Sequence, residues 1–167
     1  MQKNAKYWIE NLDLQKHPEG GWFKEVYRSE EIAPKDSLSK GFTSDRNFST
    51  SIYFLLEKDE ISVLHRIKSD EIWHYYDGGS VVEIISLQGG KLKRQLLGRD
   101  IESGEHLQIV VLKNTWFGAW LTNQKSFALV GCTVSPGFHF DDFEMADRKL
   151  LQEYPLLKKE IAIFINS

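Results

Sequence analysis

The sequence has only one cysteine, Cys132, so the chain cannot form a disulfide within itself. Cys132 lies in an apolar run, FALVGCTV, which is typical of a small buried residue and fits a reducing compartment. No apolar stretch approaches the length of a membrane span, and the N-terminus shows no signal peptide. We therefore expect a cytoplasmic protein without a membrane partner.

Excess charge of either sign is also absent. The chain of 167 residues carries 21 Lys and Arg against 24 Asp and Glu, a formal net charge of -3 at pH 7. Proteins that bind nucleic acid normally carry a clear basic excess, so no nucleic-acid partner is expected. The sequence contains no phosphate-binding loop, dinucleotide fingerprint, or serine or cysteine nucleophile motif. These absences favour a small molecule as the partner.

Aromatic residues, by contrast, are abundant, at 13% of the chain with five tryptophans. This content is typical of a large β-core or of an aromatic-lined pocket, and composition does not separate the two. Near the start of the chain, one face of an amphipathic helix is formed by Ala5, Trp8, Ile9 and Leu12, with Asn4 as the N-cap.

From Trp22 on, short runs rich in β-branched and aromatic residues predict strands. Nine runs fit this pattern: GWFKEVYRS, STSIYFLLE, ISVLHRI, EIWHYY, SVVEIISL, KLKRQLLG, HLQIVVL, TWFGAWL and SFALVGCTVS. Turn residues such as DGG at 77–79 and QGG at 88–90 predict that neighbouring strands pair as antiparallel hairpins. Residues 29–47 are polar, rich in turn residues and aperiodic, which predicts a long mobile loop.

A helical pattern returns near the end of the chain in MADRKLLQEYP and LLKKEIAIFI, and Pro155 separates the two short helices. A central series of strands with helices at both ends predicts a mostly β protein. We expect a jelly-roll β-barrel, or a relative of one, in a single domain that spans residues 1–167.

The stretch LHRIKSDEIWHYYDG places two histidines and a glutamate between two predicted strands. His65 shares a strand face with Val63 and Ile67, and these apolar companions predict that it points inward. Glu71 and His74 lie on opposite faces of the next strand, so they cannot serve the same site. A short hairpin through KSD would bring Glu71 beside His65 on the inner face.

A histidine and a carboxylate inside an apolar barrel have three explanations. They are two ligands of a metal, a general acid/base pair with tuned pKa values, or a hydrogen-bonded pair that only orders the interior. The residues alone leave all three open.

The spacing from His65 to Glu71 to Gly78 resembles the first motif of the cupin superfamily, and residues 104–117 resemble its second motif. Over nearly the whole chain, the sequence resembles a specific subfamily of largely uncharacterised single-domain cupins. The runs that carry this resemblance are HPEGGWFKEVYRS, STSIYFLL, HRIKSDEIWHYYDG, TWFGAW and LVGCTVSPGFHFDDFE. The resemblance implies a cupin-type jelly-roll barrel that pairs as a homodimer through sheet edges.

The sequence departs from the cupin pattern at two metal-ligand positions. Ile67 stands where the motif has its second histidine, and Phe117 stands at the histidine of the second motif. Only His65 and Glu71 remain, fewer than the three or four ligands that firm metal binding normally uses. We therefore expect no cofactor, and a divalent metal only if another side chain completes the set. The candidates are His139, His106, His17 and Gln108.

The polar and aromatic residues around this stretch supply further candidates. Arg28 and Arg66 are potential anchors for an anionic ligand, and both equally fit surface ion pairs. The aromatic residues that can form a stacking wall for a sugar ring, or belong to the core, are Trp73, Tyr75, Trp116 and Trp120. The residues expected to contact the ligand are Arg28, Arg66, Trp73, Trp116, Phe117 and His139.

The leading hypothesis is a small-molecule-binding cupin that catalyses a metal-independent acid/base reaction on a sugar-like or carbonyl metabolite. The superfamily includes metal-free epimerases, so the resemblance implies an epimerase or isomerase type of chemistry. His65 would be the base, Glu71 its orienting partner and Tyr75 the acid. The alternatives are a metal-dependent enzyme with His65 and Glu71 as ligands, and a non-catalytic binding module.

Overall fold

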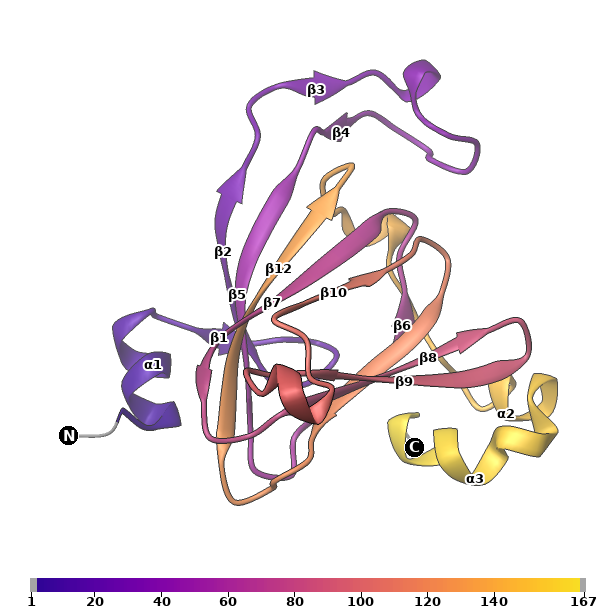
Figure 1. Ribbon diagram of the computed structural model, residues 1–167. Helices are drawn as coiled ribbons and strands as arrows, with labels where there is room; N and C mark the ends of the chain where they lie inside the picture. Colours follow the sequence, from indigo (N-terminus) through magenta and orange to yellow (C-terminus); the bar gives the residue numbers. More distant parts are fainter. Residues whose placement is uncertain (1–2, 166–167) are drawn as a thin grey trace.

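Two antiparallel sheets form the body of the molecule in the computed structural model, which describes residues 3–165 (Figure 1). The first sheet has the order β1 (Gln15–Lys16), β2 (Trp22–Arg28), β5 (Thr50–Glu57), β12 (Phe127–Ser135), β7 (Asp70–Gly78) and β10 (Gln108–Val111). The second has the order β13 (Glu144–Met145), β6 (Ile61–Arg66), β11 (Trp116–Leu121), β8 (Val82–Gln88) and β9 (Lys91–Leu97).

The two sheets face each other across one apolar core. Inward-pointing residues from both sheets share this core, including Phe54 and Trp73 from the first sheet and Ile84 and Phe117 from the second. Alternate residues of each strand therefore point inward, as the period of two requires. The prediction of a mostly β jelly roll with helices at both ends is confirmed.

All nine predicted runs form strands, and the hairpin expected through QGG is present between β8 and β9, but most of the nine do not pair in sequence order. Within residues 3–165, two pairs of consecutive strands among these nine hydrogen-bond to each other, β2 with β5 and β8 with β9. Strands β5, β6, β7 and β8 alternate between the two sheets instead. The hairpin expected through KSD is therefore absent, because β6 pairs with β11 and β7 pairs with β12.

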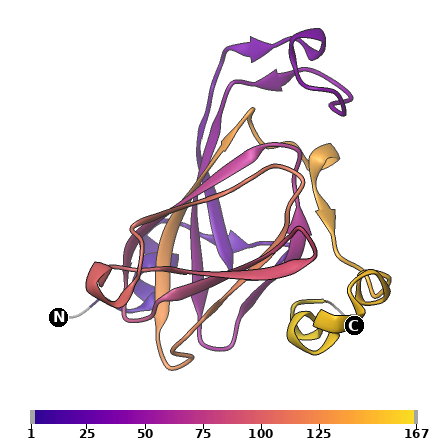
Figure 2. The ribbon, with the colours of Figure 1, turned by 45° about the vertical axis from the view of Figure 1, so that its right-hand side comes forward.

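Short helices cover the outer faces of the two sheets (Figure 2). Helix α1 (Ala5–Asn11) is capped by the Asn4 side chain, which accepts a hydrogen bond from the backbone of Tyr7, and it packs on Leu55 and Leu129 of the first sheet. The C-terminal segment packs on the second sheet through α2 (Leu150–Glu153), η4 (Pro155–Leu157), α3 (Lys158–Ile161) and η5 (Ala162–Phe164). None of the helices formed by residues 3–165 is long and apolar enough to cross a membrane.

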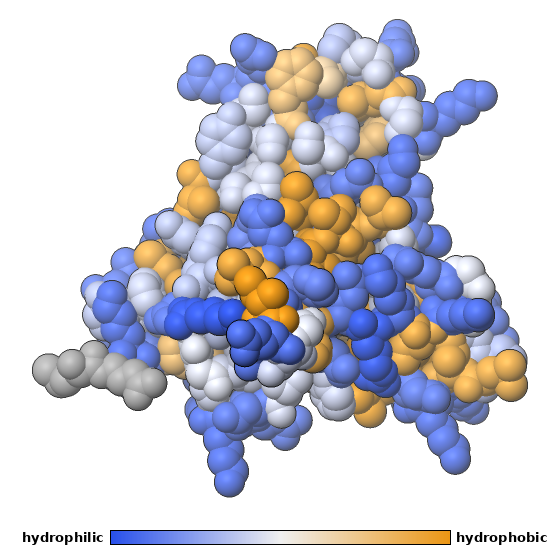
Figure 3. All heavy atoms as spheres, in the orientation of Figure 1, coloured by the Kyte–Doolittle hydropathy of each residue, from blue (hydrophilic) through white to orange (hydrophobic). Residues whose placement is uncertain are grey.

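An arm extends from one end of the sandwich (Figure 1), formed by β3 (Ile32–Ala33), η1 (Lys35–Ser37) and β4 (Arg46–Asn47). The long loop predicted at residues 29–47 therefore contains one short antiparallel pairing, of β3 with β4. Figure 3 shows apolar side chains gathered on the molecular surface beneath the arm. Two further short 3₁₀ helices, η2 (Ile101–Ser103) and η3 (Phe140–Asp142), complete the elements.

Candidate active site

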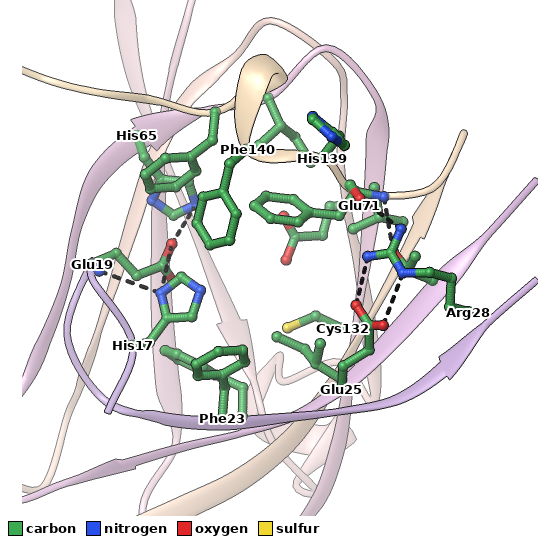
Figure 4. Close-up of a pocket in the computed structure, with 17 residues that line it drawn as sticks. His17, Glu19, Phe23, Glu25, Arg28, His65, Glu71, Cys132, His139 and Phe140 are labelled. Carbon is green, nitrogen blue, oxygen red and sulfur yellow. Dashed lines mark hydrogen bonds and ion pairs between the residues drawn. The ribbon is translucent and has the colours of Figure 1, made fainter. Parts of the chain in front are cut away.

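A cavity of about 220 Å³ opens between the two sheets at the end of the sandwich that carries the arm. Strands β2, β5, β6, β7 and β12 form its walls, and the segment around η3 lies across its mouth (Figure 4). Apolar side chains make up much of the lining, namely Phe23, Ile52, Phe54, Ile67, Val134, Phe138, Phe140 and Phe143.

His65 lies on the cavity wall with both ring nitrogens engaged. Its Nδ1 donates to the backbone oxygen of Val63 at 2.8 Å, and its Nε2 lies 3.2 Å from Oε2 of Glu19. A carbonyl oxygen can only accept, so Nδ1 must carry a hydrogen. One proton therefore remains to be shared between His65 Nε2 and Glu19 Oε2.

Burial favours the uncharged form of this His65–Glu19 pair. It raises the pKa of Glu19 and lowers the pKa of His65, since each ion would lose its hydration inside the barrel. Ser62 donates a hydrogen bond to Oε1 of Glu19 at 2.8 Å, which leaves Oε2 to carry the proton. We therefore assign the shared proton to Glu19, with its hydroxyl donating to His65.

A tight turn in HPEGG carries Glu19 into the cavity. Gly20 and Gly21 adopt φ angles of +104° and +77°, which side chains disfavour. A Cβ on Gly20 would lie 2.1 Å from the backbone oxygen of Ile61, so the turn packs directly against β6. The backbone of Val63 donates to the oxygen of Glu19 at 2.9 Å and fixes the turn on that strand.

His17, at the start of the same turn, presents a hydrogen-bond donor to the cavity. The backbone N–H of Glu19 donates to His17 Nδ1 at 3.3 Å, so the neutral ring carries its hydrogen on Nε2. Figure 4 shows the ring of His17 reaching toward the open space, with Nδ1 on the side of Glu19. Burial lowers the pKa of His17, which keeps the ring neutral.

Glu71 lies on the opposite side of the cavity from His17 (Figure 4). Burial raises its pKa to about 7, and the nearby Glu19 adds to this rise while His65 opposes it. The Cys132 thiol also lines the cavity, and burial, with Glu71 nearby, raises its pKa well above the usual value, so the thiol stays protonated. A carboxyl group with a pKa near neutrality can both accept and return a proton.

The rim of the cavity is polar. Arg28 makes two parallel hydrogen bonds to Glu25, at 2.9 and 2.7 Å, and further bonds to the side chain of Asn47 and the backbone oxygen of Phe138. His139 is half exposed at the mouth, and its Nδ1 lies 3.4 Å from a carboxylate oxygen of Asp141.

Three phenylalanines of the η3 segment, Phe138, Phe140 and Phe143, form an aromatic cap over the cavity by edge-to-face contacts. A buried ion pair anchors this cap, because both carboxylate oxygens of Asp142 accept hydrogen bonds from Arg46 of the arm, at 2.6 and 2.7 Å. The arm therefore helps to hold the mouth of the cavity in shape.

The structure brings four of the sequence-predicted site residues together at the cavity: Arg28, His65, Glu71 and His139. It places the other five outside the lining. Arg66 pairs with Glu144 and stacks on Trp116, whose side chain packs beneath the C-terminal helices. The hydroxyl of Tyr75 donates to the backbone oxygen of Ser80. Trp73 and Phe117 belong to the core, although the Phe117 ring lies against His65, with 4.2 Å between ring centroids.

Three lining residues were missed as functional groups: His17, Glu19 and Glu25. The sequence offers His17 only as a spare metal ligand, and HPEGG only as part of the resemblance to the cupin subfamily. The sequence signal that points to His17 and Glu19 is that these two ionisable residues stand beside two glycines. A turn with two glycines can bring its backbone and side chains close to a neighbouring strand.

The two ligands predicted from the sequence, His65 and Glu71, gain no third ligand from a cluster in the part of the chain that the structure describes. Among residues 3–165, no three His, Cys, Asp or Glu side chains converge as a ligand set. Nδ1 of His65 donates to Val63, and its Nε2 shares the proton assigned above to Glu19. We therefore derive no chemical step through a metal.

Known proteins resemble this chain over most of its length. The profile of the family described as "Cupin superfamily (DUF985)" matches residues 6–146. An uncharacterized protein of Saccharomyces cerevisiae, YML079W, is 32% identical over 143 residues, which cover 80% of this chain and 71% of that protein.

Two solved structures agree with this chain over almost all of its length. A hypothetical protein from Leishmania major has 31% identity and a TM-score of 0.88, with 99% of this chain and 100% of that chain covered. A protein from Shewanella oneidensis has 36% identity and a TM-score of 0.86, with 99% of both chains covered. With the family profile and these relatives in agreement, the chain belongs to the cupin superfamily, in the family DUF985.

Proposed function

We propose that the cavity is the active site of a metal-independent acid/base enzyme of the epimerase or isomerase type, acting on a small carbonyl compound. The observation that carries this proposal is the placement of Glu71, a carboxyl group with a pKa of about 7, across the cavity from the Nε2–H donor of His17. Titratable groups tuned toward neutrality inside an apolar cleft are typical of acid/base sites.

The chemistry needs one base and one donor. The Glu71 carboxylate takes a proton from the carbon next to the carbonyl group, and the electron pair of that C–H bond forms the C=C bond of an enolate. The carbonyl oxygen gains the negative charge, which a hydrogen bond from His17 Nε2–H stabilises. Glu71 then returns the proton to the neighbouring carbon, while the hydroxyl proton of a 2-hydroxy carbonyl substrate passes to the former carbonyl oxygen. This completes an isomerisation in which no oxidant or reductant is consumed.

His65 has a positioning role in this scheme, and Tyr75 has none. The side chain of His65 is only 3% exposed, and its two nitrogens are engaged by Val63 and Glu19. His65 holds Glu19, and the backbone N–H of Glu19 in turn sets the tautomer of His17. This assignment moves the base from His65 to Glu71.

Exchange of carbon-bound hydrogen with solvent tests the proposal. The protein is incubated in D2O with hydroxyacetone, dihydroxyacetone, cyclohexanone and 2-hydroxycyclohexanone, and proton NMR follows loss of the signal from the carbon next to the carbonyl. We expect exchange above the buffer rate for at least one compound. Glu71→Gln should reduce the rate by about 100-fold or more, as expected for loss of a general base.

A matched variant tests whether Tyr75, the acid predicted from the sequence, takes part in the reaction. Tyr75→Phe removes the hydroxyl that lies outside the cavity and should leave exchange unchanged. Exchange at the buffer rate for all four compounds, or full exchange in a folded Glu71→Gln variant, would overturn the proposal and leave a ligand-binding module as the better description.

A further inference from the structure

Acidic groups outnumber basic groups in the cavity. Three carboxyl groups line it, from Glu19, Glu25 and Glu71. Within residues 3–165, Arg28 is the one lysine or arginine in the lining. His17 is buried and neutral, and His139 at the rim already faces the carboxylate of Asp141.

The guanidinium group of Arg28 is already occupied. Two of its N–H groups bind both carboxylate oxygens of Glu25, and its NH1 binds Asn47 and the backbone oxygen of Phe138. A guanidinium group has five N–H donors, so at most one remains for a ligand. The bidentate pair also cancels the positive charge that would attract an anion.

The interior would penalise a second anion. Apolar and aromatic side chains dominate the walls, and a carboxylate or phosphate placed beside Glu71 would lose its hydration without meeting a free cation. At about 220 Å³, the cavity is also smaller than the usual range for drug-sized ligands. A phosphorylated or nucleotide-linked sugar fits neither property.

We propose that the cavity selects a small uncharged carbonyl compound and excludes carboxylates and phosphates, and that Glu25 sets this selectivity by neutralising Arg28 at the mouth. The requirement for a carbonyl oxygen that faces His17 rests on the proposed function. The exclusion of anions rests on the charges and contacts of the cavity itself.

The test compares benzamide with benzoate, which share one ring and nearly the same shape but differ by one negative charge. Affinities for the wild type, Glu25→Gln and Glu30→Gln are measured at pH 8 by ligand-observed NMR titration, and a crystal structure with benzamide locates the ring. We expect benzamide to bind the wild-type cavity at least about tenfold more tightly than benzoate. Glu25→Gln frees Arg28 and should raise the affinity for benzoate by about tenfold, whereas Glu30→Gln, on the exposed segment after β2, should leave the ratio unchanged.

Three results would overturn the inference. They are equal or tighter binding of benzoate by the wild type, an unchanged ratio in Glu25→Gln, and binding of neither compound in the cavity. Binding does not depend on turnover, so the two proposals fail separately. Selective binding of benzamide without deuterium exchange of any ketone would defeat the enzymatic proposal and retain the selectivity.

Discussion

At the scale of single residues, the site is governed by the cost of burying charge. Glu19, His65 and Glu71 are all at least nine-tenths buried, and the pKa of each moves toward the value that keeps the group neutral. The single proton between His65 and Glu19 satisfies that pair. The pKa of Glu71 is about 7, so its ionisation is the step that remains sensitive to pH near neutrality.

The pH dependence of stability should reveal Glu71. Its pKa rises from 4.5 to about 7 on folding, so the folded state holds this proton more tightly than the unfolded state. The resulting stabilisation is complete below pH 4.5 and is lost as the pH rises through 7, and it amounts to on the order of 3 kcal/mol. Urea unfolding at pH 5 and pH 8 should show this loss in the wild type and a smaller one in Glu71→Gln.

Glu30→Gln, an exposed substitution, is the control for the change of residue type and should keep the wild-type pH dependence. If Glu71→Gln lost stability between pH 5 and pH 8 as strongly as the wild type does, the carboxyl of Glu71 would not have a raised pKa.

At the scale of elements, the HPEGG turn positions two of the cavity residues, and it depends on one close approach. The turn brings the backbone of Gly20 against β6 and points Glu19 at His65. The side chain of His17 enters the cavity from the same turn. A change in the path of this turn therefore displaces both side chains together.

Gly20→Ala should disrupt the turn in two ways. Its φ of +104° strains any side chain, and its new Cβ would lie 2.1 Å from the backbone oxygen of Ile61. We expect a loss of roughly 2–4 kcal/mol in the free energy of unfolding, measured by urea titration. Gly41 is the matched control, since its φ is +116° with nothing within 4 Å of a Cβ, and Gly41→Ala should cost only about 1 kcal/mol. Equal losses in the two variants would show that contact with β6 contributes nothing.

Local sequence patterns predicted the elements better than their partners. Period-two alternation identified all nine long strands and the inward direction of His65, because these features depend on neighbouring residues. Pairing could not be predicted in this way, since a turn that joins two strands in one sheet has the same residues as a turn that crosses to the other sheet. The place of Glu19 beside His65 depends on such a contact between distant segments.

At the scale of the whole molecule, the cavity depends on contacts between distant parts of the chain. The first sheet supplies Glu71 and Cys132, the second supplies His65, and the N-terminal turn supplies His17 and Glu19. The sandwich holds these groups around one space, although they come from segments that are far apart in the sequence. The role expected for each group therefore requires the intact fold.

Metal content is a property of the whole protein that separates two of the initial hypotheses. The purified protein is incubated with manganese, iron, nickel or zinc, desalted and subjected to elemental analysis. Because the cavity lacks a convergent ligand set within residues 3–165, we expect far less than one metal ion per chain. Near-stoichiometric metal that is lost in both His65→Ala and Glu71→Ala would instead establish the metal-dependent alternative.

The ion pair that anchors the aromatic cap also bears on the order in which parts of the protein fold. Arg46 and Asp142 are 96 positions apart in the sequence, and the aromatic cap over the cavity is anchored by their ion pair. Contacts between such distant residues form late, because the intervening chain must first be synthesised and folded. A nascent chain that has not yet emerged to Asp142 therefore lacks the ion pair that anchors the aromatic cap, and the entrance of the pocket is completed only after that part of the chain has folded.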